Sequence, residues 1–246
     1  AFHQTIPLER RIYGIPWEWY EEYGIQRLGY HGASHSYVAE TLTDMYGSTG
    51  KAISCHLGGS GSLCAIDDGK SVDTSFGISL QVGVIQSNRC GDIDPFIVPF
   101  LQKKGLSLDQ VLDGLTKRGG LLGISGVSND LRDVQEAADA GNERARLAID
   151  VFCNGIVRHI GAYYAELGGL DHLVFTGGIG EHGTRIREAV CHQLKHMGIL
   201  LDDEKNQSCT GANTGISRTD SPVTIHVIPA NEELGVARKT FAYLRA

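Results

Sequence analysis

The sequence predicts an α/β fold with helices on both faces of a mixed sheet, in which a three-stranded antiparallel meander is followed by helix–strand crossovers. Two observations support this prediction. Short β-branched and apolar runs follow one another closely after Lys51, whereas longer segments with apolar residues at helical spacing follow Pro95. In addition, glycine-rich turns interrupt the chain where apolar runs stop, at residues 56–62, 118–126 and 176–181.

The first 75 residues predict two helices and then the meander. A helix is predicted at residues 16–23, because proline is tolerated in a first turn, and a second at residues 34–45. Strands are predicted at residues 52–57, 62–67 and 71–75. A glycine loop separates the first two strands, and Asp68-Gly69, a hairpin signal, separates the second from the third.

The remainder of the chain predicts helices that alternate with two more strands. Helices are predicted at residues 95–103, 108–117, 130–140, 142–167 and 184–196. Buried strands are predicted at residues 171–175 and 224–228, ended by Gly177-Gly178 and by Pro229. Asn231 is expected to cap a last helix that runs to Leu244.

This order of elements does not match a doubly wound dinucleotide fold, in which strands and helices alternate from the start. It resembles one half of the actin-like ATPase (ribonuclease H-like) fold shared by actin, sugar kinases and chaperone ATPases, whose nucleotide lies between two such halves. Glycine lets backbone N–H groups converge on an anion without Cβ obstruction. The chain has no Walker A pattern. Its three glycine-rich turns therefore predict a nucleotide held from several sides.

Composition argues against other classes of protein. The 246 residues carry a net charge of −7 with scattered basic residues, so no nucleic-acid partner is expected. No apolar run reaches the ~20 residues that span a bilayer, and no signal-peptide pattern is present. Six singly spaced cysteines predict reduced thiols rather than a zinc site or a disulfide framework. We expect a cytoplasmic protein with no membrane partner.

Several long motifs resemble those of acetate kinases. Residues 29–38, G-Y-H-G-A-S-H-S-Y-V, resemble the family segment R-[YF]-G-F-H-G-T-S-H-x-Y-V. Residues 71–77 and 88–95 resemble S-V-D-T-S-M-G and T-R-S-G-D-[IL]-D-P, and residues 121–132, 175–181 and 229–238 follow in the family's order. The resemblance spans nearly the entire chain. It implies reversible transfer of the ATP γ-phosphoryl group to acetate, giving acetyl phosphate and ADP, with Mg²⁺ or Mn²⁺ as cofactor.

The resemblance also implies how the chain is organised. Residues 1–5 resemble the end of F-D-T-A-F-H-Q-T, so the family's metal-associated Asp would precede Ala1 and the upstream acyl-binding domain would be missing. Residues 1–50 are expected to form a linker and the end of the N-terminal domain, and residues 51–246 a C-terminal nucleotide-binding domain. Such a fragment should bind ATP weakly and turn over little. The family is homodimeric, and the apolar face of the 142–167 helix is expected to contribute.

Arg89 and His31 are the expected catalytic residues. Phosphoryl transfer requires positioning and positive charge at the equatorial oxygens, and a guanidinium supplies both without losing its proton. Arg89 matches the family's phosphoryl-stabilising Arg, although an ion pair to Asp92 or Asp94 is the alternative from the residues alone. His31 matches the family's transition-state-stabilising His, with a structural role as the alternative. His35 is expected to be structural.

The resemblance assigns further residues to the nucleotide and the metal. His56 and the loop Gly58, Gly59, Ser60 and Gly61 are expected at the phosphates. Asp130, Leu131 and Arg132 are expected at the adenosine, and Gly178, Ile179 and Gly180 beneath the adenine and α-phosphate. From the residues alone Asp130 is a helix N-cap, and both roles can hold because a cap is local and Arg132 is expected to point elsewhere on the turn. Glu232 matches the Mg²⁺-linked acid, with a response to the helix dipole as the alternative.

Three positions depart from the family pattern. Gly59 replaces the Asn of H-L-G-N-G, His182 replaces an Asn after G-G-I-G-E, and Leu80-Gln81-Val82-Gly83 replaces P-L-E-G. These departures bear on nucleotide preference and acyl chain length more than on the reaction class. Propionate or butyrate kinase, or a non-catalytic actin-like nucleotide-binding domain, remain the alternatives to acetate kinase.

Overall fold

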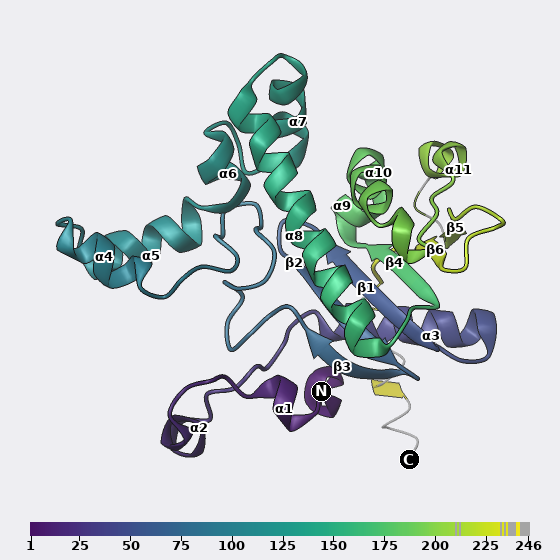
Figure 1. Ribbon diagram of the computed structural model, residues 1–246, viewed down its shortest axis with the longest axis horizontal. Coiled ribbons are helices and arrows are strands. Elements are labelled where there is room, and N and C mark those ends of the chain that lie inside the picture. The colour runs from purple at the N-terminus through teal and green to yellow at the C-terminus, as the bar shows by residue number, and fades with distance from the viewer. Residues whose placement is uncertain (210, 212, 232, 234, 236–239, 242–246) are drawn as a thin grey trace.

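A six-stranded mixed sheet with the order β3-β2-β1-β4-β6-β5 organises the structure (Figure 1). This computed structural model describes residues 1–209, 211, 213–231, 233, 235 and 240–241. The strands are β1 Lys51–Leu57, β2 Gly61–Asp67, β3 Lys70–Thr74, β4 His172–Thr176, β5 Thr214–Gly215 and β6 Thr224–Val227.

The predicted antiparallel meander is confirmed. β1 pairs antiparallel with β2, and β2 with β3, whereas β4 and β6 continue the sheet parallel to β1. Asp68 and Gly69 both have positive φ, 44° and 78°, as a two-residue hairpin turn requires. The short β5 pairs antiparallel with β6 and was not predicted, because two residues show no alternation of polar and apolar side chains.

Most predicted helices are also confirmed, with ends within a few residues. The helices are η1 Phe2–Thr5, α1 Leu8–Arg11, α2 Trp17–Tyr23, α3 Gly32–Tyr46, α4 Ile97–Lys103, α5 Leu108–Lys117, α6 Gly120–Ser125, α7 Leu131–Asp139, α8 Glu143–Leu167, α9 Gly177–His182, α10 Thr184–Gln193, η2 Lys195–Met197 and α11 Asp203–Ser208. The short η1, α1 and α11 were not predicted. The expected helix from Asn231 to Leu244 lies largely outside the described residues and stays a prediction.

Two of the predicted glycine-rich turns continue as short helices. Gly120 and Gly177 have φ of +60° and +76° and begin α6 and α9. The expectation of a simple turn at these two places was wrong. Glycine allows the sharp change of direction, and the residues after it then adopt helical geometry.

Successive side chains of a strand point to opposite faces of the sheet, and helices pack against both faces. On one face, Ala52 and Cys64 pack with Val38 and Leu42 of α3. On the other face, Ile53 belongs to the larger core that α6, α7, α8 and α10 complete, with α8 crossing the sheet (Figure 1).

The apolar side of α8 is used within the chain. Phe152, Ile156 and Ile160 of this helix are buried in the larger core. The sheet covers these residues, so only exposed apolar residues of α8 such as Leu147 are left for the expected dimer interface, which stays a prediction.

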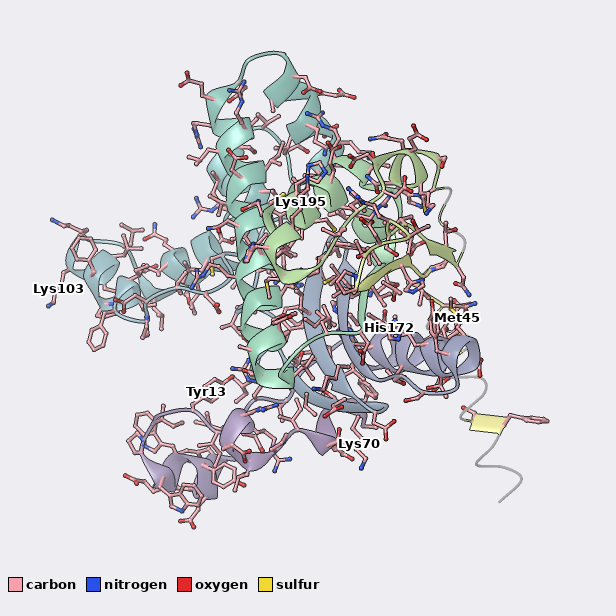
Figure 2. All side chains as sticks on the ribbon, turned by 45° about the vertical axis from the view of Figure 1, so that its right-hand side comes forward. Tyr13, Met45, Lys70, Lys103, His172 and Lys195 are labelled. Carbon is pink, nitrogen blue, oxygen red and sulfur yellow. The ribbon has the colours of Figure 1, made fainter. Side chains whose placement is uncertain are left out.

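Two parts of the chain extend from the central sheet. The helices α4 and α5 form an arm that projects away from it, with Lys103 near the outer end (Figures 1 and 2). At the N-terminus, η1 lies against β3, where His3 Nδ1 is 2.8 Å from Ser71 Oγ. No helix in the described part of the chain is long and apolar enough to cross a membrane.

Candidate nucleotide-binding and phosphoryl-transfer site

A pocket of about 630 Å³ opens at the carboxyl ends of the parallel strands β1 and β4. It brings together seven residues that the sequence assigned to the nucleotide: Gly58, Gly59, Asp130, Leu131, Arg132, Gly178 and Ile179. Ser87, Asn129, Gln135, His182 and Gly183 complete the lining and were not predicted as nucleotide-binding residues. Gly180 does not line it, because it is buried with its Cα hydrogen toward the Phe175 backbone.

The chemistry of this pocket fits a nucleotide. Leu131 and Ile179 provide apolar surface from α7 and α9, suited to a base. A Cβ on Gly178 would meet no atom within 4 Å, and one on Gly59 would meet only Ser87 Oγ, at 3.7 Å. The backbone at these two glycines is therefore open to a ligand, as close approach by phosphate oxygens requires.

Asp130 and Arg132 interact with each other at the pocket rim. Asp130 caps α7 by accepting from the Arg132 backbone N–H at 2.9 Å, and its carboxylate also accepts from the Arg132 guanidinium. The bonds from Arg132 hold the pKa of Asp130 down, to about 2. The N-cap prediction is confirmed. The expectation that Arg132 points elsewhere was wrong, because its guanidinium donates to the Asp130 carboxylate.

A second pocket, of about 570 Å³, adjoins the first through their shared residue Gly178. It is lined by His31, His56, Gly177, Gly178, Ala230, Asn231 and Glu233. The two pockets thus lie next to each other, one lined by residues predicted at the nucleoside and the other by the predicted catalytic histidine. Glu232, the expected metal ligand, lies outside the described residues, so its assignment stays a prediction.

His31 occupies a constrained position at this second pocket. It precedes α3 with φ +55° and ψ +24°, in the left-handed region that few non-glycine residues adopt. Its ring stacks on that of His56, with centroids 4.1 Å apart, and its Nδ1 lies 2.9 Å from Ser62 Oγ. Burial, with the nearby charges of His56, His3 and Arg89, lowers the pKa of His31 to about 3. His31 is therefore neutral near pH 7.

The other two histidines of this region are held by serines. His56 Nδ1 lies 2.8 Å from Ser34 Oγ, and burial lowers its pKa. His35 is fully buried between Ser54 and Ser62, with each of its ring nitrogens 2.9 Å from a hydroxyl. The structural role expected for His35 is consistent with this burial.

Arg89 is held against the first glycine loop. Its Nη1 donates to Ser60 Oγ at 3.1 Å and to Gln86 Oε1 at 3.0 Å. The alternative ion pairs are not formed among the described residues, where Asp92 accepts from the Gly83 N–H and Asp94 from the Phe96 N–H. Arg89 is thus positioned by neutral groups, and no carboxylate in the described part of the chain forms an ion pair with it, so its charge can serve an anionic ligand.

Gln86, which was not predicted, accepts hydrogen bonds from both Ser60 and Arg89. It is almost fully buried, and its Oε1 also accepts from Ser60 Oγ at 2.9 Å, while its Nε2 donates to the Leu80 carbonyl at 2.8 Å. A single glutamine after the apolar pair Val84-Ile85 carries no motif, so only the fold reveals it.

The second glycine-rich segment, residues 118–126, bonds through backbone amides to the turn that carries Arg89 and does not present these amides to a phosphate. The N–H groups of Gly119, Leu121 and Leu122 donate to the carbonyls of residues 88, 86 and 87, at 3.1, 2.9 and 3.0 Å. These amides are thus already bonded to the turn that carries Arg89. The expectation that all three glycine-rich segments face the nucleotide was wrong for this one.

Two of the three departures from the family pattern lie in the first pocket. Gly59 and His182 both line it. The third segment lies nearby, where Gln81 Oε1 is buried without a hydrogen-bond partner among the described residues.

Comparison with known proteins gives the family. The profile of the acetokinase family matches residues 1–238. An acetate kinase of Treponema denticola is 47% identical over 249 residues, covering 100% of this chain and 62% of that protein. An acetate kinase of Dictyoglomus thermophilum is 51% identical over 98% of this chain and 61% of that protein, and a propionate kinase of Citrobacter rodentium is 50% identical over 97% and 59%.

The fold agrees with these matches. The crystal structure of Porphyromonas gingivalis acetate kinase superposes with a TM-score of 0.95 at 38% identity, covering 99% of this chain and 62% of that one. A propionate kinase structure from Francisella tularensis gives 0.91 at 38% identity. The chain spans about three fifths of the length of the relatives it matches. From Ala1 to Arg238, the chain belongs to the acetokinase family.

Proposed function

We propose that this chain is the nucleotide-binding part of an acetate kinase, which transfers the ATP γ-phosphoryl group reversibly to acetate. One observation carries the proposal beyond family membership. The first pocket shares Gly178 with a second pocket lined by His31, whose pKa is lowered by burial and, to a smaller extent, by charges that include the nearby Arg89 guanidinium. A pocket that fits a nucleotide, a neutral hydrogen-bond donor and a cation with no ion-pair partner among the described residues thus lie in one region.

Each group has a defined task in direct transfer. The loop at Gly58 and Gly59 and the backbone at Gly178 would hold the phosphate chain. A carboxylate oxygen of the acceptor would attack the γ-phosphorus while the bond to the β–γ bridging oxygen breaks. Arg89 would stabilise charge on the equatorial oxygens, and neutral His31 would donate a hydrogen bond to one of them. Mg²⁺ supplies further charge neutralisation when bound, and Glu232 is the residue we assign to it.

The Arg89→Ala variant of the complete gene product tests this proposal. If Arg89 stabilises the transferring group, acetyl phosphate formation should fall by roughly 10²–10³-fold with little change in ATP affinity. Arg144→Ala is a matched control, because that guanidinium instead bonds the Gly123 and Ile124 carbonyls. Unchanged turnover in Arg89→Ala would favour a non-catalytic nucleotide-binding domain.

A second acceptor is supported by one comparison. The 50% identity to a propionate kinase equals that to the acetate kinases within a few per cent. Steady-state rates with acetate, propionate and butyrate would decide between these acceptors. The substrate with the highest kcat/KM is the one to which the site is complementary in the transition state.

We also propose that the protein is a cytoplasmic homodimer. The arm supports a contact, because Phe96, Phe100 and Leu112 expose 75%, 57% and 43% of their surface. All six cysteines are free thiols, as in a reducing compartment. Light scattering of wild type and Phe100→Asp would test the dimer, which this substitution should weaken. A monomeric wild type would contradict it.

A further inference from the structure

Three side chains, Ser62, His35 and Ser54, connect His31 to the interior in one unbranched chain of hydrogen bonds. His31 Nδ1 lies 2.9 Å from Ser62 Oγ, which lies 2.9 Å from His35 Nε2. His35 Nδ1 lies 2.9 Å from Ser54 Oγ. Ser54, Ser62 and His35 are all completely buried, so no water replaces these contacts.

The fold explains how these residues meet. Ser54 on β1 and Ser62 on β2 lie on the face of the sheet that α3 covers, the face shared with Ala52 and Cys64. His35 lies four residues after His31, one turn along α3, so both rings reach this face. Nothing in the sequence marks Ser54 or Ser62, because lone serines in strands have no motif.

Counting protons leaves two arrangements that satisfy the chain. The hydroxyl of Ser62 has one proton, so it can donate to only one of its two imidazole partners and must accept from the other. Because both histidines are neutral, they must carry their protons on the same ring nitrogen. Either both are Nε2–H, or both are Nδ1–H. The pKa of His35 is lowered well below its usual value by burial, and that of His31 is lowered to about 3.

Ser54 distinguishes the two arrangements. Among the described contacts, its hydroxyl has one hydrogen-bond partner, His35 Nδ1. If both rings are Nε2–H, Ser54 donates to His35, His35 donates to Ser62, and Ser62 donates to His31, so every proton is used. If both are Nδ1–H, Ser54 accepts instead, and its own proton is left without an acceptor in a dry site, which costs free energy.

We propose that Ser62, which bonds His31 directly, and Ser54, which acts through His35 and Ser62, are positioning residues that keep His31 in the Nε2–H tautomer. That tautomer presents an N–H from the ring nitrogen that Ser62 does not contact. The identification of a phosphoryl oxygen as the acceptor of this N–H rests on the proposed function. The opposite tautomer would present a lone pair there, which repels an anionic oxygen.

Long-range ¹H–¹⁵N correlation spectra of the labelled chain test the tautomer directly, because protonated and unprotonated ring nitrogens resonate far apart. Wild-type His31 should show a protonated Nε2 and an unprotonated Nδ1. Ser54→Ala and Ser62→Ala should each convert His31 to a mixture of tautomers. Ser71→Ala is the matched control, because this buried serine bonds His3 and Cys64, outside the chain of hydrogen bonds, and should leave the His31 tautomer unchanged.

Kinetics of the complete gene product give the second readout. Ser54→Ala and Ser62→Ala should lower kcat about tenfold or more with the KM for ATP nearly unchanged, and Ser62→Thr should restore most of it. A protonated Nδ1 in wild type, or an unchanged His31 tautomer in both alanine variants, would overturn the inference. A wild type with the expected tautomer but no phosphoryl transfer would instead refute the proposed function.

Discussion

Gly120 lies directly against the backbone of Arg89. With φ of +60°, a Cβ at this position would lie 2.8 Å from the Arg89 carbonyl oxygen and 2.9 Å from its nitrogen, well inside contact distance. The start of α6 therefore packs directly against the turn that carries Arg89, the proposed catalytic cation. The next residue, Leu121, donates its N–H to the Gln86 carbonyl.

Gly120→Ala is expected to lower stability and turnover together. The positive φ and the overlap with the Arg89 turn should cost about 3 kcal/mol in free energy of unfolding, and displacement of Arg89 should reduce kcat. Gly141→Ala is a matched control, because φ is +92° there but no atom lies within 4 Å of the added Cβ. It should cost about 1 kcal/mol and leave kcat unchanged. Equal effects of the two substitutions in urea unfolding would contradict a role for the contact.

Gln86→Leu should impair catalysis more than nucleotide binding. The substitution removes the amide oxygen that accepts from Arg89 and Ser60, so the guanidinium loses a partner that fixes its direction. We expect kcat to fall by about tenfold with the KM for ATP changed little. Gln110→Leu is the control, because that glutamine caps the distant helix α5. A rise in KM without loss of kcat would show that Gln86 serves nucleotide binding instead.

The fold was largely predictable because its signals are local. Alternation and turn residues set the meander, and Asp68-Gly69 in particular has the positive φ values that the hairpin signal implies. The short helices α6 and α9 were missed because glycine is a poor helix former, and no local signal shows that tertiary contacts will hold such a segment helical.

The candidate site was predictable where motifs are contiguous and not where it depends on packing. His31, Gly59 and Ile179 belong to runs that can be recognised in the sequence, and all three line the pockets. Gln86 and Ser62 act through side-chain bonds to residues distant in the sequence, such as Ser62 to His31. Hydrogen bonds between separate elements are set by three-dimensional register, which spacing along one segment does not reveal.

Arg187→Met is expected to be strongly destabilising. This fully buried guanidinium donates to Asn206 Oδ1 and to the Gly180 and Glu181 carbonyls, each at 2.8 Å, and so joins the end of α9 to α11. Loss of the donor leaves these oxygens unpaired, at about 3 kcal/mol or more. Arg185→Met, two residues away, removes only an exposed ion pair to Asp139 and should cost less than about 1 kcal/mol. Similar midpoints of thermal unfolding for the two variants would contradict this assignment.

Stability should fall as the pH is lowered from 7.5 to 5.5. Burial lowers the pKa of His3, His31, His35 and His56 below the usual value of 6.5. The unfolded chain therefore binds more protons than the folded one in this range, so the free energy of unfolding rises with pH. Each proton of difference contributes at most about 1.4 kcal/mol per pH unit.

Urea unfolding at several pH values, with His3→Asn beside the wild type, checks this dependence. The variant lacks one titrating group outside the proposed catalytic residues, so its stability should change less steeply with pH. Asp73 and Glu166 act in the opposite sense at lower pH, because burial raises their pKa values and the folded chain protonates first. Above pH 5.5, the histidines should therefore contribute more than these carboxyl groups to the change in the free energy of unfolding with pH. A free energy of unfolding that is flat from pH 7.5 to 5.5 would show that these histidines protonate equally in both states.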